Sequence, residues 1–510
     1  MLSRVRSASL YGIEAHPIDV EVDIASRGLP HFYIVGLPDA SVKESRDRVR
    51  AALKNTGFSF PLRPVTINMA PADLKKEGSS FDLPIAIGLT AAEGLLEESL
   101  LADYLIMGEL SLDGKIKPVK GSLSVAMLAR KTNARLILPM ENGPEAAVVA
   151  GVTVLGADSL PEVIEFLRGT GQLKEFKADG GKKPSLAQAG RYDEDFSDVK
   201  GQEHAKRALE VAASGGHNAL MIGPPGAGKT MLSRRLPGIL PPITFEEALE
   251  TTRVHSVAGL LKDGKALLDT RPFRTPHHTV SDVALVGGGQ FPHPGEVSLA
   301  HNGVLFLDEL PEFKRSVLEV LRQPLENGEV TVSRAQASVT FPARFMLVSA
   351  MNPCPCGYLG DDRHQCTCSP GAVTRYRARV SGPLLDRIDI HIEVPAVAYK
   401  DLSSDHPGEG SADIRERVMK ARLRQLDRFH GENIYANGQM KTRHIKKFCR
   451  LNGPAQGLME TASQKLALSA RAYTRVLKLS RTIADMDGQE DIGPQHLSEA
   501  IQYRSLDRVL

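Results

Sequence analysis

The chain has 510 residues, of which 42% are hydrophobic and 24% are charged. This composition is close to that of soluble globular proteins and excludes a mainly disordered chain. The 63 Lys and Arg residues nearly balance the 61 Asp and Glu residues, and the formal charge of +2 excludes a strongly basic nucleic-acid coat protein. Any contact with nucleic acid is therefore expected to be local, and the length predicts about three domains.

The N-terminus lacks the apolar core of a signal peptide. The most apolar stretch, residues 83–96, contains Glu93 and is too short to cross a bilayer. Only five cysteines are present, which argues against a disulfide framework. These features predict a cytoplasmic protein with no membrane partner.

Residues 1–172 show alternating strand and helix patterns, which predict an α/β or α+β domain. The predicted strands are 18–24, 64–70, 104–110, 134–139 and 152–155, and the clearest predicted helix is 41–55. Residues 173–195 are polar, rich in glycine and without periodicity, so we expect an interdomain linker there.

Strands and helices also alternate in residues 196–402, which predicts a parallel, doubly wound sheet. Here the predicted helices are 203–213 and 229–236, and the predicted strands are 218–222, 303–307 and 345–349. After a second break at 403–410, helical spacing continues at 412–429, 442–449, 459–485 and 494–504. Residues 403–510 are therefore expected to form an all-helical domain.

A phosphate-binding sequence lies between the strand predicted at 218–222 and the helix predicted at 229–236. It fits the pattern G-x-x-x-x-G-K-[ST], in which glycines let backbone N–H groups turn toward phosphate oxygens at a helix N-terminus. Lys229 is expected to reach the β- and γ-phosphates of a nucleotide, and the Thr230 hydroxyl to hold Mg²⁺. The predicted nucleotide-binding residues are Gly223, Pro224, Pro225, Gly226, Ala227, Gly228, Lys229 and Thr230.

Polar residues follow two further strands of this predicted sheet. Asp308 and Glu309 come directly after an apolar strand, and Asn352 follows the strand predicted at 345–349. Parallel strands bring their carboxyl ends to the edge of the sheet where ligands bind. We expect Asp308 to assist Mg²⁺, Glu309 to polarise the attacking water, and Asn352 to bond that water or the γ-phosphate.

An arginine follows a short helical turn later in the same domain. Arg387 is a candidate for a trans-acting finger, a guanidinium from a neighbouring subunit that stabilises charge on the transferred phosphoryl group. A surface ion pair of Arg387 with Asp386 or Asp389 is an alternative that the spacing leaves open.

Four of the five cysteines are clustered. Cys354, Cys356, Cys366 and Cys368 supply four thiolates, the ligand set of a tetrahedral structural Zn²⁺ site. The spacing differs from the commoner C-x₂-C arrangement, and a reduced, flexible loop or a redox pair are the alternatives. Cys449 stands alone on a predicted helix and is expected to be buried packing.

The phosphate-binding sequence, residues 305–309, Asn352 and residues 375–389 together resemble the magnesium-chelatase-like AAA+ ATPases, most closely the ComM/YifB group. Distinctive segments of the resemblance are residues 275–279, 284–289, 294–301 and 352–357. The resemblance covers essentially the whole chain. It implies a Lon-protease-like (S5-type) α+β N-terminal domain, an AAA+ parallel αβα core and a helical C-terminal lid.

The resemblance also implies an assembly and an activity. It implies a homo-hexameric ring with ATP and Mg²⁺ sites between subunits, Arg387 entering from the neighbour and Arg471 acting as the second sensor from the lid. It further implies a helicase-like DNA motor that promotes branch migration during natural transformation and homologous recombination. The expected partners are single-stranded, duplex or branched DNA and recombination proteins.

Basic residues in two segments are candidates for contact with DNA inside such a ring. Arg271 and Arg274 lie between the phosphate-binding helix and the Asp308 strand, and Arg334 lies near the tip of a hairpin predicted over 330–340. Such side chains would grip phosphates without reading bases, although a plain solvated charge is an equal interpretation for Arg334. Nearby histidines match no common metal site and are expected to make ordinary hydrogen bonds; they are His277, His278, His293 and His301.

The N-terminal domain resembles the Lon peptidase, with one departure. Residues 76–80 resemble the loop that carries the Lon nucleophile, which places Ser80 near the nucleophile position. The helix after residues 118–121 lacks the lysine that a Ser–Lys protease needs, and Lys120 is out of register. Without a base, Ser80 is a poor nucleophile, so we expect a scaffold more than a protease.

Two other functions remain as alternatives. One is a chelatase-like motor that uses ATP to remodel a protein partner for metal insertion; the fused N-terminal domain and the cysteine cluster argue against it. The other is a binding or scaffold protein whose ATPase serves only as a switch.

Overall fold

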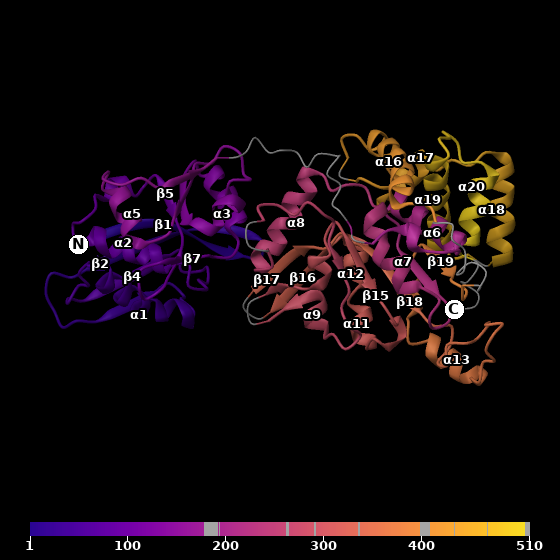
Figure 1. Cartoon of the computed structure of the whole chain (residues 1–510), viewed down its shortest axis with the longest axis horizontal. Coiled ribbons are helices and arrows are strands. Elements are labelled where there is room, and N and C mark those ends of the chain that lie inside the picture. Colours follow the sequence, from indigo (N-terminus) through magenta and orange to yellow (C-terminus); the bar gives the residue numbers. More distant parts are fainter. Residues whose placement is uncertain are drawn as a thin grey trace. The chain divides into compact units, whose positions relative to one another are not determined.

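The structure is a computed structural model that describes residues 1–177, 192, 194–261, 265–289, 292–334, 337–397, 408–432, 434–466 and 468–504. The chain divides into two compact units (Figure 1). Unit 1 comprises Met1–Ser185 and Thr244–Leu268, and unit 2 comprises Leu186–Ile243 and Asp269–Leu510. Most of the predicted linker and of the predicted break at 403–410 lies outside the described residues. Within the described ranges, no helix is long and apolar enough to span a bilayer.

Unit 1 contains a mixed eight-stranded sheet in the order β10-β9-β8-β5-β1-β2-β4-β3. Its two longest strands form the antiparallel pair β1–β2, whose register runs from Leu2 opposite Asp23 to Tyr11 opposite Glu14. The strands are β1 (Leu2–Tyr11), β2 (Glu14–Ile24), β3 (Phe32–Val35), β4 (Val65–Ala70), β5 (Tyr104–Ile106), β8 (Arg135–Pro139), β9 (Val154–Ala157) and β10 (Lys174–Phe176), with a separate hairpin of β6 (Glu109–Leu110) and β7 (Ile116–Lys117). The predicted strands are confirmed except at 104–110, which divides between β5 of this sheet and β6 of the hairpin. The strands β1, β3, β7 and β10 went unpredicted, and β10 lies inside the predicted linker.

The helices of unit 1 include one from the middle of the chain. They are α1 (Ala40–Asn55), α2 (Asp82–Ala92), α3 (Ser122–Lys131), α4 (Gly143–Ala146), α5 (Leu160–Leu167) and α8 (Phe245–Ala258). Arg253 of α8 donates hydrogen bonds to the Glu14 carboxylate at 2.7 Å and to the Ile13 carbonyl at 3.1 Å. The Ser256 hydroxyl of α8 donates to Glu145. These contacts explain why Thr244–Leu268 groups with unit 1 although both flanking segments belong to unit 2.

Unit 2 is built on a five-stranded sheet in the order β12-β15-β18-β11-β19, and each neighbouring pair is parallel. The strands are β11 (Ala219–Ile222), β12 (Phe273–Arg274), β15 (Val304–Leu307), β18 (Met346–Met351) and β19 (Ile390–Glu393). Every residue of β11, β15 and β18 is buried, as expected for parallel strands covered on both faces. The parallel sheet predicted for this region is therefore confirmed.

Helices and a hairpin surround this sheet. The helices are α6 (Glu203–Gly215), α7 (Lys229–Arg235), α9 (Asp282–Val286), α10 (Glu296–Leu299), α11 (Arg315–Glu319), α12 (Arg322–Asn327), α13 (Pro370–Arg377) and α14 (Gly382–Leu385). A short pair is formed by β13 (Gly287–Gly288) and β14 (His293–Pro294). The predicted hairpin is confirmed as β16 (Glu329–Arg334) and β17 (Ala337–Pro342), whose connecting residues 335–336 lie outside the described residues.

The end of the chain is helical and lies beside α6 in Figure 1. It comprises α16 (Ser411–Arg428), α17 (Thr442–Phe448), α18 (Gly453–Leu466), α19 (Ala470–Met486) and α20 (Pro494–Gln502). The single helix predicted over 459–485 is wrong, because the segment contains the end of α18 and a new start at α19. The Ser469 hydroxyl accepts a hydrogen bond from the Ala472 N–H at 3.1 Å, so it caps the new helix.

Buried charges join α19 to the sheet. Asp389, which precedes β19, lies 3.2 Å from His217 Nδ1 and pairs with Arg475 of α19. The His217 ring also lies 2.8 Å from the Thr482 hydroxyl of α19. Burial lowers the pKa of His217; for Asp389, Arg475 and His217 outweigh the opposing effect of burial and hold its pKa below the usual range. A cluster of this kind fixes the angle between the helices and the sheet, because each charge loses its partner if the helix moves.

Lys478 of α19 offers a test of this packing. Burial lowers the pKa of Lys478 from 10.5 to about 8, and its ammonium donates to the Gly438 carbonyl at 2.9 Å. The unfolded chain therefore binds more protons between pH 8 and 10.5, and stability rises with pH across that window. We expect Lys478→Met to raise the free energy of unfolding at pH 7 by roughly 1–3 kcal/mol and to flatten this rise. Lys420→Met, on the exposed face of α16, is the control; equal unfolding curves for both variants would contradict the assignment.

Candidate functional site

The phosphate-binding loop connects β11 to α7 and needs glycine at three positions. Gly226 and Gly228 have φ angles of 75° and 86°, in the left-handed region that glycine adopts without strain. A Cβ atom on Gly223 would lie 2.1 Å from the carbonyl oxygen of Val394. The loop therefore packs directly on the backbone after β19, and its N–H groups lead into the N-terminus of α7.

Lys229 is the first residue of α7, and its side chain turns back over the loop. The ammonium donates hydrogen bonds to the carbonyls of Gly223 at 2.7 Å and Pro224 at 2.9 Å, and to Asn352 Oδ1 at 3.2 Å. Burial lowers the pKa of Lys229, and the nearby carboxylates oppose that effect. The structure thus confirms that the loop lysine and the amide after β18 meet at one edge of the sheet.

An oxygen pair suited to Mg²⁺ lies beside this lysine. The Thr230 hydroxyl donates to Asp308 Oδ2 at 2.6 Å, and Asp308 Oδ1 accepts the Glu309 N–H at 3.0 Å. Mg²⁺ prefers hard oxygen ligands, usually one or two protein groups together with water and phosphate. The hydroxyl and the carboxylate therefore fit the ion that the sequence predicts.

Glu309 has an unusual backbone and an unpredicted neighbour. Its φ angle is 52°, and its half-exposed carboxylate lies 3.4 Å from His278 Nδ1. The His278 ring also contacts the His277 ring in a tilted arrangement, with a centroid distance of 4.1 Å. Residues 275–279 follow β12, the strand next to β15, so the topology brings His278 to the carboxylates. Sequence reasoning assigned His278 an ordinary hydrogen bond; its partner is the predicted water-polarising carboxylate.

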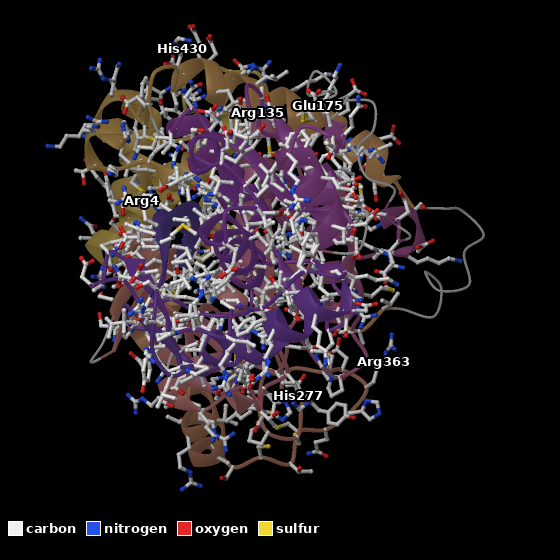
Figure 2. All side chains as sticks on the ribbon, turned by 90° about the vertical axis from the view of Figure 1, so that its left-hand side faces the viewer. Arg4, Arg135, Glu175, His277, Arg363 and His430 are labelled. Atoms are coloured by element: carbon white, nitrogen blue, oxygen red, sulfur yellow. The ribbon has the colours of Figure 1, made fainter. Side chains whose placement is uncertain are left out.

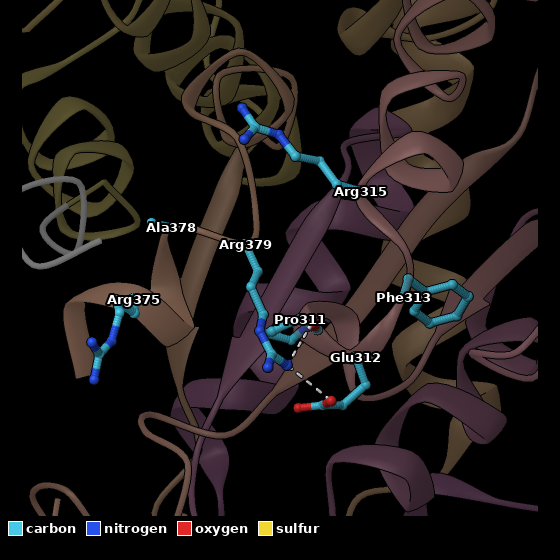
Figure 3. Close-up of a pocket in the computed structure, with 7 residues that line it drawn as sticks. All are labelled: Pro311, Glu312, Phe313, Arg315, Arg375, Ala378 and Arg379. Atoms are coloured by element: carbon cyan, nitrogen blue, oxygen red, sulfur yellow. Dashed lines mark hydrogen bonds and ion pairs between the residues drawn. The ribbon is translucent and has the colours of Figure 1, made fainter. Parts of the chain in front are cut away.

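A pocket of about 400 Å³ is lined in part by Pro311, Glu312 and Phe313, which follow these carboxylates in the chain (Figure 3). The Arg379 guanidinium donates to Glu312 at 3.0 Å and to the Pro311 carbonyl at 3.4 Å. The other lining residues are Phe313, Arg315, Arg375 and Ala378. Arg375 and Arg379 flank Tyr376, which hydrogen-bonds to the backbone of Asn352; burial raises the pKa of Tyr376 to about 12.

Arg387 and Arg471 lie close to one another but in different surroundings. The Arg387 side chain is buried and pairs with Glu326 of α12, and burial lowers its pKa. The Arg471 guanidinium is 60% exposed and lies 3.8 Å from Asp386. The alternative pairing of Arg387 with Asp386 or Asp389 is therefore not the observed one: Asp386 faces Arg471, and Asp389 pairs with Arg475.

The four clustered cysteines converge as predicted. Their Sγ atoms all lie within 4.8 Å of one another, and three of the separations are 3.4, 3.6 and 3.7 Å. Backbone hydrogen bonds from Tyr358 and Thr367 lower the pKa of the Cys356 thiol to about 6. Four sulfur atoms at this spacing fit a closed tetrahedral Zn²⁺ site.

Three family models match successive parts of the chain. "Magnesium chelatase, subunit ChlI" matches residues 195–402, "Subunit ChlI of Mg-chelatase" matches residues 20–142, and "Magnesium chelatase, subunit ChlI C-terminal" matches residues 408–504. YifB of Escherichia coli (strain K12) is 46% identical over 510 residues, and competence protein ComM of Haemophilus influenzae is 46% identical over 512 residues. Both alignments cover 100% of this chain and 98% of the relative.

The chain belongs to the ComM/YifB family. The magnesium-chelatase 38 kDa subunit of Rhodobacter capsulatus is more distant, with 26% identity over 331 residues, 59% of this chain and 84% of that protein. The ComM/YifB family is thus related to the magnesium chelatases, and this AAA+-like relationship indicates an ATPase. The phosphate-binding loop and its carboxylates lie within the region matched at residues 195–402.

Two of the arginines predicted to contact DNA are engaged within this ComM/YifB chain. The Arg271 guanidinium donates to the carbonyls of Pro241 and Asn302, each at 2.6 Å. Arg274 pairs with both carboxylate oxygens of Glu296, at 2.6 and 2.7 Å. These contacts favour a structural role for both residues, while the side chain of Arg334 lies outside the described residues. Exposed side chains nearby include His277, labelled in Figure 2.

Two side chains of residues 76–80, the loop that resembles the one carrying the Lon nucleophile, have partners within unit 1. The Ser79 hydroxyl donates to Glu109, and the buried Lys76 donates to the carbonyls of Pro71 and Leu74. In the described part of unit 1, no hydrogen bond joins the Ser80 hydroxyl to a lysine.

Sequence reasoning missed Gln202 of this ComM/YifB chain. The residue has a φ angle of 58° and precedes α6, and its amide donates to the Ala227 carbonyl of the phosphate-binding loop and to the Pro395 carbonyl at 3.3 Å. A single glutamine before a helix carries no signal for such a bond. Gln202 thus connects the phosphate-binding loop to the backbone after β19.

Proposed function

We propose that this ComM/YifB protein is an ATP-dependent DNA motor that acts as a hexamer and promotes branch migration of recombination intermediates. The convergence of Lys229, Thr230, Asp308 and Asn352 at one sheet edge carries the ATPase part of the proposal. The DNA part is supported by the full-length similarity to a protein named for competence, which suggests a role in natural transformation or homologous recombination. Recombination proteins are the expected partners.

The site residues divide the chemistry among them. Lys229 exchanges its carbonyl partners for the β- and γ-phosphates, and the loop N–H groups bind the same oxygens. Thr230 and Asp308 hold Mg²⁺, which neutralises charge on the phosphates. Glu309 polarises the attacking water, and Asn352 orients it against the γ-phosphate.

Arg387 and Arg471 complete the proposed site. Arg387 acts in trans on the nucleotide of the neighbouring subunit, and Arg471 acts as a sensor from the C-terminal helices. Arg387 then has to leave Glu326, so ring assembly replaces a carboxylate of the same chain by a phosphate of the next site. Because of this exchange, Arg387 can act on a nucleotide only after the ring has assembled.

Mixing two inactive variants tests the action of Arg387. We expect Arg387→Ala and Lys229→Ala each to lower ATP turnover at least about 100-fold, because a finger and a phosphate-binding lysine both stabilise transferred charge. Mixed rings should regain activity, since a Lys229→Ala subunit still offers Arg387 to an intact loop. Turnover and ring size are measured together. A fully active Arg387→Ala monomer, or mixed rings without recovery, would contradict the trans role.

We further propose that Cys354, Cys356, Cys366 and Cys368 bind one structural Zn²⁺. Elemental analysis of protein purified without chelators should give about one zinc per chain. Cys366→Ser/Cys368→Ser should lose the metal, and Cys449→Ala should retain it, because Cys449 is buried elsewhere among the C-terminal helices. Protein free of zinc under these conditions would contradict the site.

The ATPase rate with different DNAs tests the whole proposal. The rate is measured without DNA and with single-stranded DNA, duplex DNA and a four-way junction, using wild type and Lys229→Ala. Stimulation by DNA that disappears in the variant supports a DNA-coupled motor and leads to branch-migration assays. A Lys229-dependent rate that no DNA changes would instead favour remodelling of a protein partner, the second candidate, which the similarity to magnesium-chelatase subunits supports.

Unit 1 is proposed to be a Lon-like scaffold that shapes the ring, and the C-terminal helices to be its lid. The pairing of Ser79 with Glu109 supports a structural use of the former nucleophile loop. Peptidase activity lost in Ser80→Ala would overturn the scaffold proposal for unit 1.

A further inference from the structure

The cysteine cluster begins two residues after Asn352, the amide that contacts the lysine of the phosphate-binding loop. Asn352 accepts the hydrogen bond from Lys229 at 3.2 Å, and Cys354, two residues later, is completely buried. The first zinc ligand of the proposed site is therefore connected to the amide of the nucleotide site by one intervening residue, Pro353.

The two loops are also in direct contact. Gly357 follows the second cysteine with a φ angle of 88°, and a Cβ atom there would lie 2.6 Å from Cδ of Pro225. Pro225 belongs to the phosphate-binding loop, so the Cys356–Gly357 corner rests on the loop itself. The same added Cβ would lie 3.9 Å from Cγ of Asn352. Gly357 therefore lies close both to the phosphate-binding loop and to the amide that contacts Lys229.

The helix after the cluster supports the same segment. The Ser369 hydroxyl caps α13 directly after Cys368, accepting the Ala372 N–H at 3.3 Å. From the end of α13, Arg377 donates to the Pro353 carbonyl at 3.1 Å, and Tyr376 bonds to the backbone of Asn352. Residues 352–357 are therefore held between the phosphate-binding loop, the cysteines and α13.

Bound metal would be the strongest restraint in this arrangement. The chain between Cys356 and Cys366 has neither helix nor strand, and the exposed Arg363 within it (Figure 2) donates to the Val397 carbonyl at 2.8 Å. Such a loop gains its fixed shape when four thiolates close around one ion. Loss of the ion would release the Cys356–Gly357 corner from Pro225 and loosen Asn352.

We propose that zinc binding at the four cysteines and nucleotide binding at the phosphate-binding loop are energetically linked through residues 352–357. The inference rests on the proposed ATP and zinc sites and adds a regulatory connection between them. Linkage is reciprocal: if zinc increases the affinity for ATP, ATP increases the affinity for zinc by the same factor. Couplings between sites commonly amount to about 5–150-fold.

Reversible removal of zinc tests the linkage on the full chain. The affinity for a fluorescent ATP analogue with Mg²⁺ is measured on zinc-loaded protein, after a zinc-selective chelator, and after zinc is returned. We expect the affinity to fall about tenfold on chelation and to recover with zinc. The affinity for zinc, measured by equilibrium competition with the chelator, should in turn be higher by about the same factor when the analogue is bound. Equal affinities with and without zinc would overturn the linkage, whereas zinc-loaded protein that binds no analogue would overturn the ATP site itself.

Two glycine substitutions separate the contact from the metal. Gly357→Ala places a methyl group against Pro225, whereas Gly360→Ala, at a similar φ angle of 83°, has nothing within 4 Å of its added Cβ. Both variants carry the same backbone strain in the same loop, and thermal unfolding checks that both are folded. We expect both to keep about one zinc, and only Gly357→Ala to bind the analogue at least about fivefold more weakly. Equal analogue affinities of the two variants would overturn the proposed route.

Discussion

Glu309→Gln is expected to lower the ATP turnover number at least about 100-fold, because the amide cannot take a proton from the attacking water. The same variant should bind ATP with an affinity within about threefold of that of wild type. A group that acts only in the transition state affects the turnover number and leaves the affinity for the substrate unchanged. The structure gives a reason for this separation. Lys229 is held by Gly223, Pro224 and Asn352, and none of these contacts involves Glu309. Single-turnover hydrolysis and analogue titration on the same preparation measure the two effects.

Glu312→Gln is the matched control for Glu309→Gln. Glu312 is three residues further along, is 43% exposed and pairs with Arg379 at 3.0 Å. The same isosteric change there removes a surface charge pair, which commonly contributes less than about 1 kcal/mol. We expect turnover of Glu312→Gln to stay near that of wild type. Comparable turnover in both variants would remove Glu309 from the proposed role and point to another group beside His278.

The core of the site was predictable from sequence because its chemistry depends on neighbours along the chain. A strand, a glycine turn and a helix in succession place Lys229 and Thr230 without any tertiary information. Asp308 and Asn352 could be placed by one further rule, since parallel strands end at a common edge. The observed bonds of Lys229 to Asn352 and of Thr230 to Asp308 join residues far apart in the sequence. The convergence of the four cysteines was also predictable, because they form two close pairs within one short stretch of the chain.

Contacts between loops that are brought together only by the tertiary structure were not predictable from the sequence. His278 reaches Glu309 because β12 is a two-residue edge strand beside β15, a neighbour relation without a sequence signal. Gln202 reaches the phosphate-binding loop from a left-handed turn before α6. The predicted helix over 459–485 failed because the apolar spacing continues across the break, while Ser469 provides only a local cap.

The grouping of α8 with unit 1 could not be predicted from the sequence. Its capping box, Thr244 with Glu247, marks the start of a helix clearly. Which core the helix joins depends on its partners, and those are Glu14 and Glu145. The sequence around Ser256 and Arg253 does not indicate which domain the helix packs against. Residues 196–402 were therefore predicted to form one continuous domain.

Lys229→Ala is expected to weaken binding of ATP with Mg²⁺ at least about 100-fold, because charge-assisted hydrogen bonds to phosphate each contribute about 1.5–3 kcal/mol. The variant should not be less stable than wild type. Burial lowers the pKa of Lys229 below 10.5, so keeping its charge opposes folding at neutral pH, and alanine removes that cost. Lost binding together with an unchanged or higher unfolding temperature distinguishes a missing ligand from a damaged fold.

The stability of wild type and its affinity for ATP should both depend on pH through Lys229. Because the folded pKa of Lys229 is lowered, wild type gains stability as pH rises from that pKa toward 10.5, and Lys229→Ala should lack this gain. In wild type, ATP affinity should fall over the same rise, as the ammonium loses its proton. Lys446→Ala, on the exposed face of α17, should change neither curve. If Lys229→Ala binds ATP as wild type does, the loop is not the nucleotide site, and the proposed motor loses its source of energy.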